Sequence, residues 1–288
     1  MKKFIQENKI SLILWGIFEI VAVSLFCSTS NIFYLLNFTY IGTCIALGIF
    51  LLKHQRKYAR NFVQIGIGLY MLVYVGLICR ENMQIEGFWY YLFLGVFEAA
   101  TMHYLIAKIL GPIVFGRWWC GYACWTGMVL DLLPYKVPQG KRKTWGRGRY
   151  VLFVLSLTFV ASLFIFQVPE KETILFYAFI IGNVLYYLLG IWLAWICKDN
   201  RAFCKYLCPV TIFLKPMSYF SCLRVKCDHD KCIHCKKCIE HCPMNVDMID
   251  DSRKRCNGTE CILCAKCINA CPMKALKLTF FEREKKRD

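Results

Sequence analysis

Residues 232–243 read Cys-Ile-His-Cys-Lys-Lys-Cys-Ile-Glu-His-Cys-Pro, and residues 261–272 read Cys-Ile-Leu-Cys-Ala-Lys-Cys-Ile-Asn-Ala-Cys-Pro. Both stretches have the spacing C-x2-C-x2-C-x3-C-P. In such a run three closely spaced thiolates wrap one iron–sulfur cube, and the fourth cysteine is carried toward the other cube. The spacing therefore predicts two [4Fe–4S] clusters with crossed ligand sets. Cluster one is predicted to use Cys232, Cys235, Cys238 and Cys271, and cluster two is predicted to use Cys261, Cys264, Cys267 and Cys242.

The alternative for these thiolates is structural zinc. Zinc sites usually combine two C-x2-C pairs, or pairs with histidine, rather than two triple runs that each end in Cys-Pro. The sequence contains no P-loop, dinucleotide fingerprint or Ser-His-Asp pattern, so a catalytic role has no support from motifs. We interpret residues 221–288 as an α+β bacterial-type two-cluster ferredoxin domain, in a protein that transfers electrons rather than catalysing a reaction itself.

Residues 1–220 are dominated by long apolar blocks. The whole chain is 58% hydrophobic and 19% charged, which is unusually apolar for a soluble domain. A block of roughly 20 apolar residues can cross a bilayer as a helix, and no small-residue cleavage site follows the first block, so it is expected to be retained. The prediction is an all-α polytopic membrane bundle of about six transmembrane helices. The six blocks are Ile10–Cys27, Ile32–Leu52, Phe62–Cys79, Phe88–Leu110, Tyr150–Val168 and Ile174–Cys197.

The basic residues behind the net charge of +17 are distributed unevenly between the two sides of the predicted membrane bundle. Only Arg80 and Lys171 lie in predicted outer loops, while basic residues crowd the short loops on the other side, for example in residues 136–149. The positive-inside rule explains this asymmetry. We therefore expect a multi-pass protein of the inner cell membrane, with both termini and the ferredoxin domain cytoplasmic. Its partners would be the lipid bilayer and other redox subunits, and not nucleic acid.

A second cysteine pattern occurs twice in the membrane part. Residues 117–124 read Arg-Trp-Trp-Cys-Gly-Tyr-Ala-Cys, and residues 201–208 read Arg-Ala-Phe-Cys-Lys-Tyr-Leu-Cys. Residues 62–134 and 150–216 are each a predicted two-helix hairpin followed by this motif, so we expect parallel repeats with both motifs at equal depth. Four thiolates at one depth could hold an additional iron–sulfur centre, zinc, a pair of redox dithiols, or nothing. The four cysteines are Cys120, Cys124, Cys204 and Cys208.

Paired Cys-x3-Cys motifs after membrane helices, followed by a two-cluster ferredoxin, resemble the membrane polyferredoxins of anaerobic respiration. These include the membrane ferredoxin subunit of periplasmic nitrate reductase systems (NapH), the membrane regulator of nitrous oxide reductase (NosR) and the oxidase-assembly protein CcoG. The resemblance covers about Phe88 to the C-terminus. It implies electron transfer between a quinol or cytoplasmic donor and a membrane or extracytoplasmic redox partner.

This sequence departs from the pattern of that family in two places. Trp125 stands where the family usually has proline, so a different local turn is expected there. No extracytoplasmic flavin-binding domain precedes the first helix, which favours the smaller nitrate-type plan.

Two other functions fit the same residues. The chain could be a maturation or regulatory protein that reduces a metal or cofactor during assembly of a respiratory enzyme, or a transmembrane thiol relay that uses the Cys-x3-Cys pairs. His103 and Glu98 lie within a predicted span, where ionisable groups are costly and often functional. They are candidates for a quinone headgroup site, and the alternative for His103 is a hydrogen-bonded structural role.

Overall fold

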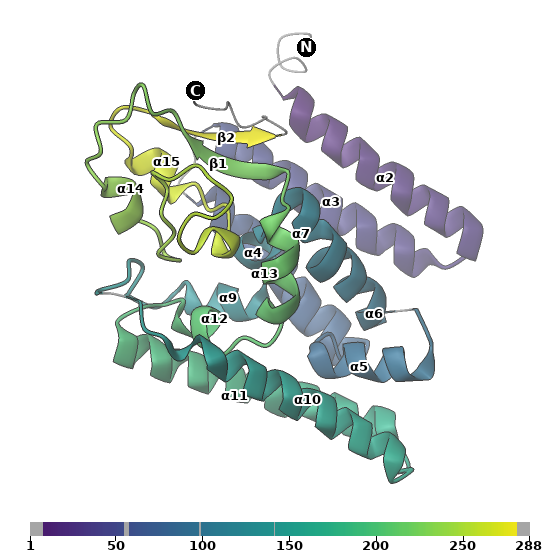
Figure 1. Cartoon of the computed structure of the whole chain (residues 1–288). Helices are drawn as coiled ribbons and strands as arrows, with labels where there is room; N and C mark the ends of the chain where they lie inside the picture. Colours follow the sequence, from purple (N-terminus) through teal and green to yellow (C-terminus); the bar gives the residue numbers. More distant parts are fainter. Residues whose placement is uncertain (1–7, 55–57, 98, 141, 281–288) are drawn as a thin grey trace.

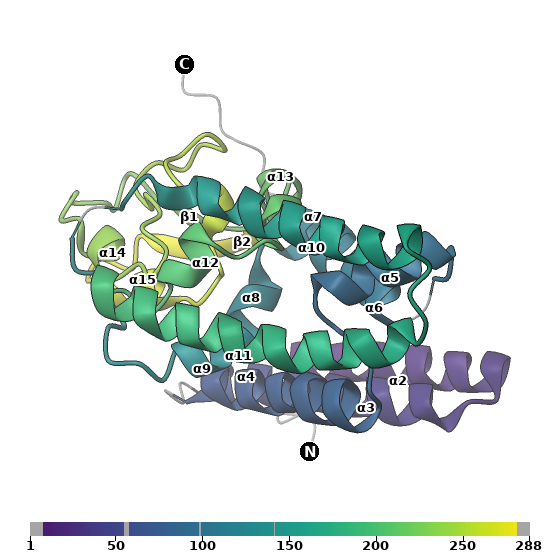
Figure 2. The same cartoon turned by 90° about the horizontal axis from the view of Figure 1, so that it is seen from below.

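The computed structural model describes residues 8–54, 58–97, 99–140 and 142–280. The first two long helices pack side by side, the two of residues 148–197 lie apart from them, and the C-terminal unit (green to yellow) lies at one end of the molecule (Figures 1 and 2). Five stretches of helix are long and apolar enough to cross a membrane. They correspond to five of the six expected spans. The helices are α2 (Lys9–Thr29), α3 (Ile32–Lys53), α4 (Ala59–Leu69) continued by η1 (Tyr70–Ile78), α10 (Gly148–Ile165, preceded by η3, Trp145–Arg147) and α11 (Lys171–Cys197).

These helices present large apolar side chains outward. Ile20, Ile165 and Trp195 are well exposed, and less than half of each candidate span is buried inside the protein. Such wide apolar surfaces are not found on soluble monomers. They suit helices whose outer faces contact lipid, because the backbone groups are already hydrogen-bonded within each helix.

The expected single span Phe88–Leu110 is wrong, because the structure interrupts it at Gly95. Gly95 has φ +70°, and its N–H donates to the carbonyl oxygens of Leu92 and Tyr91. Glycine adopts this left-handed conformation without steric cost and so ends a helix. The segment consists of α5 (Ile85–Leu94), α6 (Ala99–Tyr104), η2 (Leu105–Leu110) and α7 (Gly111–Phe115).

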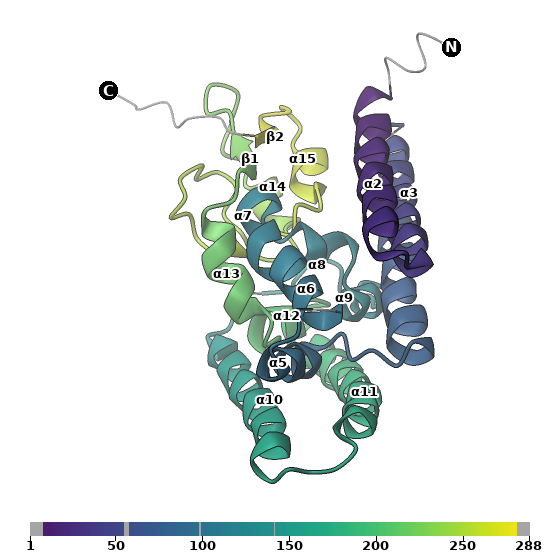
Figure 3. The same ribbon diagram turned by 90° about the vertical axis from the view of Figure 1, so that its right-hand side faces the viewer.

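Four short helices lie between the long helices and the C-terminal unit (Figure 3). They carry the two Cys-x3-Cys motifs and the residues that follow them. They are α8 (Trp118–Tyr122), α9 (Trp125–Leu130), α12 (Ala202–Tyr206) and α13 (Thr211–Tyr219).

The C-terminal unit is closed by its two ends. Strand β1 (Leu223–Cys227) pairs antiparallel with β2 (Leu276–Phe280), so that Leu223 lies opposite Phe280. Buried side chains of this unit, including Val225 and Met248, belong to the same hydrophobic core as Phe203 of α12. The unit is therefore packed onto the membrane part and shares its core. Between the strands lie α14 (Lys237–Glu240), η4 (Gly258–Glu260) and α15 (Lys266–Ala270).

Candidate metal centres

The eight cysteines of the two runs surround two cavities in the C-terminal unit, four to each. Cys271 joins the first run, and Cys242 joins the second, so each cavity draws its fourth cysteine from the other half of the unit. This is the crossed grouping that the spacing predicts, although ligation itself stays a prediction. One cavity is lined by Cys232, Cys235, Cys238 and Cys271, with Cys227 of β1 beside them, and the other by Cys242, Cys261, Cys264 and Cys267.

The two halves of the unit have matching backbones. His234 and Lys236 have φ of 53° and 59°, and their counterparts Leu263 and Ala265 have the same values. Such left-handed residues curl a loop so that successive N–H groups turn inward, where they can face an anion. The repeat of these angles explains how both loops come to surround a cavity.

Backbone N–H groups also reach the fourth cysteine of each set. The N–H of Val246 donates to Cys242 Sγ at 3.4 Å, and the N–H of Ala275 donates to Cys271 Sγ at 3.3 Å. Hydrogen bonds of this kind favour the thiolate form and tune a cluster held by it.

The cavity of Cys261 fits a positively charged metal core. Its other walls include apolar side chains such as Val225 and Met248. Burial raises the pKa of the Cys261 thiol to about 12, although the charge of Arg255 opposes this. A thiolate here therefore needs positive charge beside it, which iron supplies. Within the described ranges, no three Cys, His, Asp or Glu side chains could hold a single metal ion; the cysteines surround cavities instead.

The two membrane motifs have the same local structure. Arg117 precedes α8 and Arg201 precedes α12. The N–H of Cys124 donates to the Trp119 carbonyl at 3.1 Å, and the N–H of Cys208 donates to the Phe203 carbonyl at 2.9 Å. The turn that leads to each second cysteine is thus alike. The residues after it differ, as expected at Trp125: α9 begins directly after Cys124, whereas α13 begins only at Thr211. Trp125 begins α9, and its Nε1 donates to Asn183 Oδ1 at 2.8 Å.

The four thiols of these motifs lie in one electrostatic neighbourhood. Burial is the main cause that raises the pKa of Cys204 to about 12, and the charge of Arg201 opposes it. The other thiols that contribute to this rise are those of Cys208, Cys124 and Cys120. Burial also raises the pKa of Cys208, again with contributions from Cys120 and Cys124. The motifs are distant in sequence but adjacent in space.

The arginine that begins each motif contacts residues that follow the other motif. Arg117 donates to Thr211 Oγ1 at 3.3 Å. Arg201 donates to Asp131 Oδ1 at 2.8 Å and lies so close to Gly127 that a Cβ there would be 2.6 Å from the guanidinium. Thr211 and Gly127 hold equivalent positions, three residues after the second cysteine of each motif. The two arginines thus interlock the two halves around the thiols.

The same arginines supply positive charge beside the thiols. Arg117 and Arg201 are almost fully buried, and Lys108 is buried nearby within reach of Cys120. The Nε of Arg117 has no hydrogen-bond partner among the described residues. Buried charges are stable only when paired, and a thiolate-held cluster is anionic, so this set of groups fits an iron–sulfur centre.

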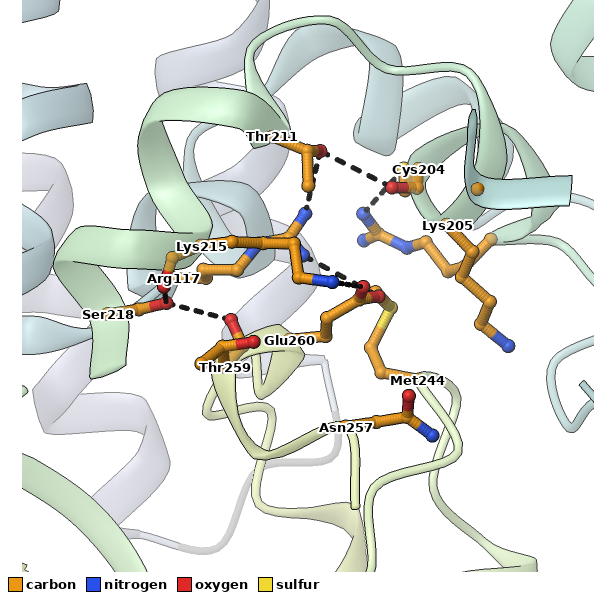
Figure 4. A network of polar contacts seen from close by, with 12 residues as sticks. Arg117, Cys204, Lys205, Thr211, Lys215, Ser218, Met244, Asn257, Thr259 and Glu260 are labelled. Carbon is orange, nitrogen blue, oxygen red and sulfur yellow. Dashed lines mark hydrogen bonds and ion pairs between the residues drawn. The ribbon is translucent and has the colours of Figure 1, made fainter. Parts of the chain in front are cut away.

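A buried carboxylate connects the C-terminal unit to this region (Figure 4). Glu260, next to Cys261, is 0% exposed. Burial alone would raise its pKa, but nearby cations such as Arg117 and Arg142 outweigh burial and hold the pKa at about 2. Sequence reasoning missed this network, because nothing in the sequence pairs Glu260 with residues so far away. Its cationic neighbours are Arg142 at 2.7 Å, Lys215 at 3.1 Å, Arg149 at 3.7 Å and Arg117 at 3.8 Å.

The Cys261–Cys264 loop rests directly on the first membrane motif. A Cβ atom added at Gly121 would lie 2.4 Å from the Ile262 carbonyl oxygen. The hydroxyl of the next residue, Tyr122, donates to the Leu263 carbonyl at 3.2 Å. Of the two cavities, the one that includes Cys261 is therefore the one next to the membrane motif.

The structure describes only one of the two candidate quinone residues, His103. His103 packs edge-on against the Trp119 ring at 4.9 Å, and its Nε2 has no hydrogen-bond partner among the described residues. Glu98 lies outside the described residues. A quinone site at His103 stays a prediction.

Comparisons with known proteins agree with the positions of the cysteines. A family described as a 4Fe-4S dicluster domain matches residues 231–275. A family described as a 4Fe-4S binding domain matches twice, at residues 104–144 and 181–226, and each match contains one Cys-x3-Cys motif. No solved structure matches the chain.

Two relatives come from Methanocaldococcus jannaschii. The uncharacterized protein MJ0750 is 27% identical over 198 residues, covering 59% of this chain and 83% of the relative. The uncharacterized protein MJ0749 is 28% identical over 174 residues, covering 57% of this chain and 66% of the relative. The matched domains and the apolar helices together indicate a membrane iron–sulfur electron-transfer protein.

Proposed function

We propose that this chain holds three iron–sulfur centres and carries electrons between a quinol or cytoplasmic donor and a membrane or extracytoplasmic redox partner. Polyferredoxins of the NapH, NosR and CcoG type would be its functional counterparts. One observation carries the proposal: three sets of four cysteines are each drawn from two separate segments, and ten of these twelve cysteines belong to or border one hydrophobic core. An iron–sulfur centre supplies reversible one-electron chemistry with no bond to a substrate.

The protein's own residues prepare each site for that chemistry. Cys204 is buried and the other three cysteines of the membrane motifs are partly buried, and Arg117 and Arg201 would offset the negative charge of thiolates that hold a cluster. The network around Glu260 holds the C-terminal unit in place, because a buried carboxylate that lost its cations would be strongly destabilising. These contacts support a fixed spacing between the centres.

We also propose that the C-terminal unit and both termini face the cytoplasm. The basic residues of the short loops support this orientation through the positive-inside rule. Other redox subunits would then meet the chain within the bilayer and at its surface.

The experiment is cofactor analysis of the protein purified without oxygen. We expect about eight irons from the two ferredoxin sets and about twelve if the membrane motif also holds a [4Fe–4S] centre. Cys124→Ser and Cys208→Ser should abolish the same electron paramagnetic resonance (EPR) signal and leave both ferredoxin signals in place. Cys79→Ser is the matched control, because Cys79 is exposed and belongs to none of the three sets.

Two results would contradict the proposal. Stoichiometric zinc without iron would remove the central claim. Absence of any EPR signal beyond the two ferredoxin signals, with reversible disulfide formation at the motif cysteines, would favour the thiol relay.

A further inference from the structure

The duplicated C-terminal unit permits a residue-by-residue comparison of its two halves. Ile233 and Ile262 each follow the first cysteine of their run, and Met273 and Met244 each follow a Cys-Pro pair. Ile233 is 60% exposed, but Ile262 is 2% exposed. Met273 is 46% exposed, but Met244 is 0% exposed. The same apolar residues are thus covered in one half and open in the other.

The covered half shows what such a face contacts. Ile262 lies under Gly121, and the neighbouring Leu263 accepts a hydrogen bond from Tyr122. The inner half is therefore covered by the membrane motif, which is itself a candidate redox centre. On the outer half, Ile233 and Met273 line the cavity of Cys235, which is exposed, and the described part of the chain leaves both side chains open.

We propose that this outer face, defined by Ile233, Met273 and Lys236, is the docking surface for a small acidic protein that carries a one-electron redox group. The inference rests on the proposed function. An exposed apolar pair provides the centre of a contact, since removing apolar surface from water favours association. In the exchange, the carrier and the cysteine-held centre each change by one electron, and no covalent bond is made or broken.

The acidic character of the partner follows from the charges that border this face. Lys236 lines the cavity. Lys237, which follows Lys236 in the chain, and Lys274, which follows Met273, are also exposed. Asp230 and Glu240 are also exposed in this unit, but among the described residues that line the cavity Lys236 is the one charged residue. The chain as a whole carries +17, so an acidic carrier would be attracted from a distance.

The test uses the full-length, cluster-loaded protein and a purified acidic bacterial two-cluster ferredoxin as the probe. Binding of the oxidised probe and stopped-flow electron transfer from the reduced probe are measured separately. Ile233→Glu and Met273→Glu should each weaken binding about tenfold or more, a loss of about 1.4 kcal/mol. Added salt should slow electron transfer to the unmodified protein, because it screens steering charges.

Leu278→Glu is the matched control. Leu278 is 50% exposed on β2 of the same unit and lies outside the cavity lining. The Leu278→Glu protein should bind the probe as the unmodified protein does. Equal binding by all variants, or equal binding of a basic carrier, overturns the docking surface. Binding of the unmodified protein's outer face to anionic vesicles in place of the probe would also overturn it. Iron content and EPR signals are recorded for every protein. Absence of iron from the unmodified protein would contradict the proposed function, whereas weaker binding by a variant that keeps its iron and its signals identifies loss of docking.

Discussion

Replacing Gly121 with alanine should weaken the contact between the C-terminal unit and the first membrane motif. Gly121 lies in helix α8, so alanine suits its backbone, and only the contact with Ile262 opposes the change. The new Cβ would be 2.4 Å from the Ile262 carbonyl oxygen, whereas ordinary contact begins at 3.4 Å. The loop and the motif must therefore separate by about 1 Å.

The size of the effect can be worked out from this geometry. Forcing a methyl group into a packed contact costs about 1–3 kcal/mol. The hydrogen bond from Tyr122 to Leu263 is stretched by the same shift, and its loss adds about 0.5–1.5 kcal/mol. Gly16→Ala is the matched control, because Gly16 lies in helix α2 with no atom within 4 Å of its added Cβ. Both variants gain about 1 kcal/mol of helix propensity, so the difference between them isolates the contact.

Two measurements follow the loop directly. Hydrogen–deuterium exchange should rise in residues 261–264 of the Gly121→Ala protein and not in the Gly16→Ala protein. The magnetic interaction between the reduced membrane centre and the nearer ferredoxin cluster should weaken, with the iron content unchanged. If both variants show the same exchange and the same EPR line shape, the reasoning about this contact is wrong.

Two further predictions concern acid stability and topology. Burial alone would raise the pKa of Asp131, but Arg201 and Arg60 hold it at about 2, so Asp131 contributes stability that is present above about pH 4 and lost as the pH falls toward 2. That contribution is about 2 kcal/mol. The Asp131→Asn protein should be less stable at pH 7, and its unfolding in detergent should lack this loss of stability at acid pH. An unchanged acid transition would contradict the prediction. A reporter that works only outside the cytoplasm should be active when it is fused near Gln84, and a reporter that works only inside should be active when it is fused after Asp288. The opposite result would overturn the proposed orientation.

The spacing and hydropathy of the sequence predicted features that depend mainly on residues close together in the chain. The two ferredoxin runs predicted the grouping of eight cysteines around two cavities, including the exchange of Cys242 and Cys271 between the halves. Hydropathy located five of the six expected spans. It could not detect the break at Gly95, because an average over a window does not distinguish one apolar helix from two that are joined by a left-handed residue.

The contacts between units could not be predicted. Glu260 meets Arg117 and Arg142, which lie more than a hundred residues earlier, and no periodicity connects such positions. A partial signal did exist. An arginine three residues before the first cysteine occurs in both membrane motifs, and the structure gives this repeated arginine a matching role in each half.

The exchange of arginines between the motifs also constrains when the membrane centre can be assembled in a cell. Arg201 and Thr211 are synthesised more than 80 residues after Arg117. At about 5–20 residues per second, the first cysteine pair waits about 4–17 s for the groups that complete its surroundings. The metal centre proposed for this site can therefore be completed only after residue 211 has been synthesised, and the early thiols must stay reduced throughout that interval.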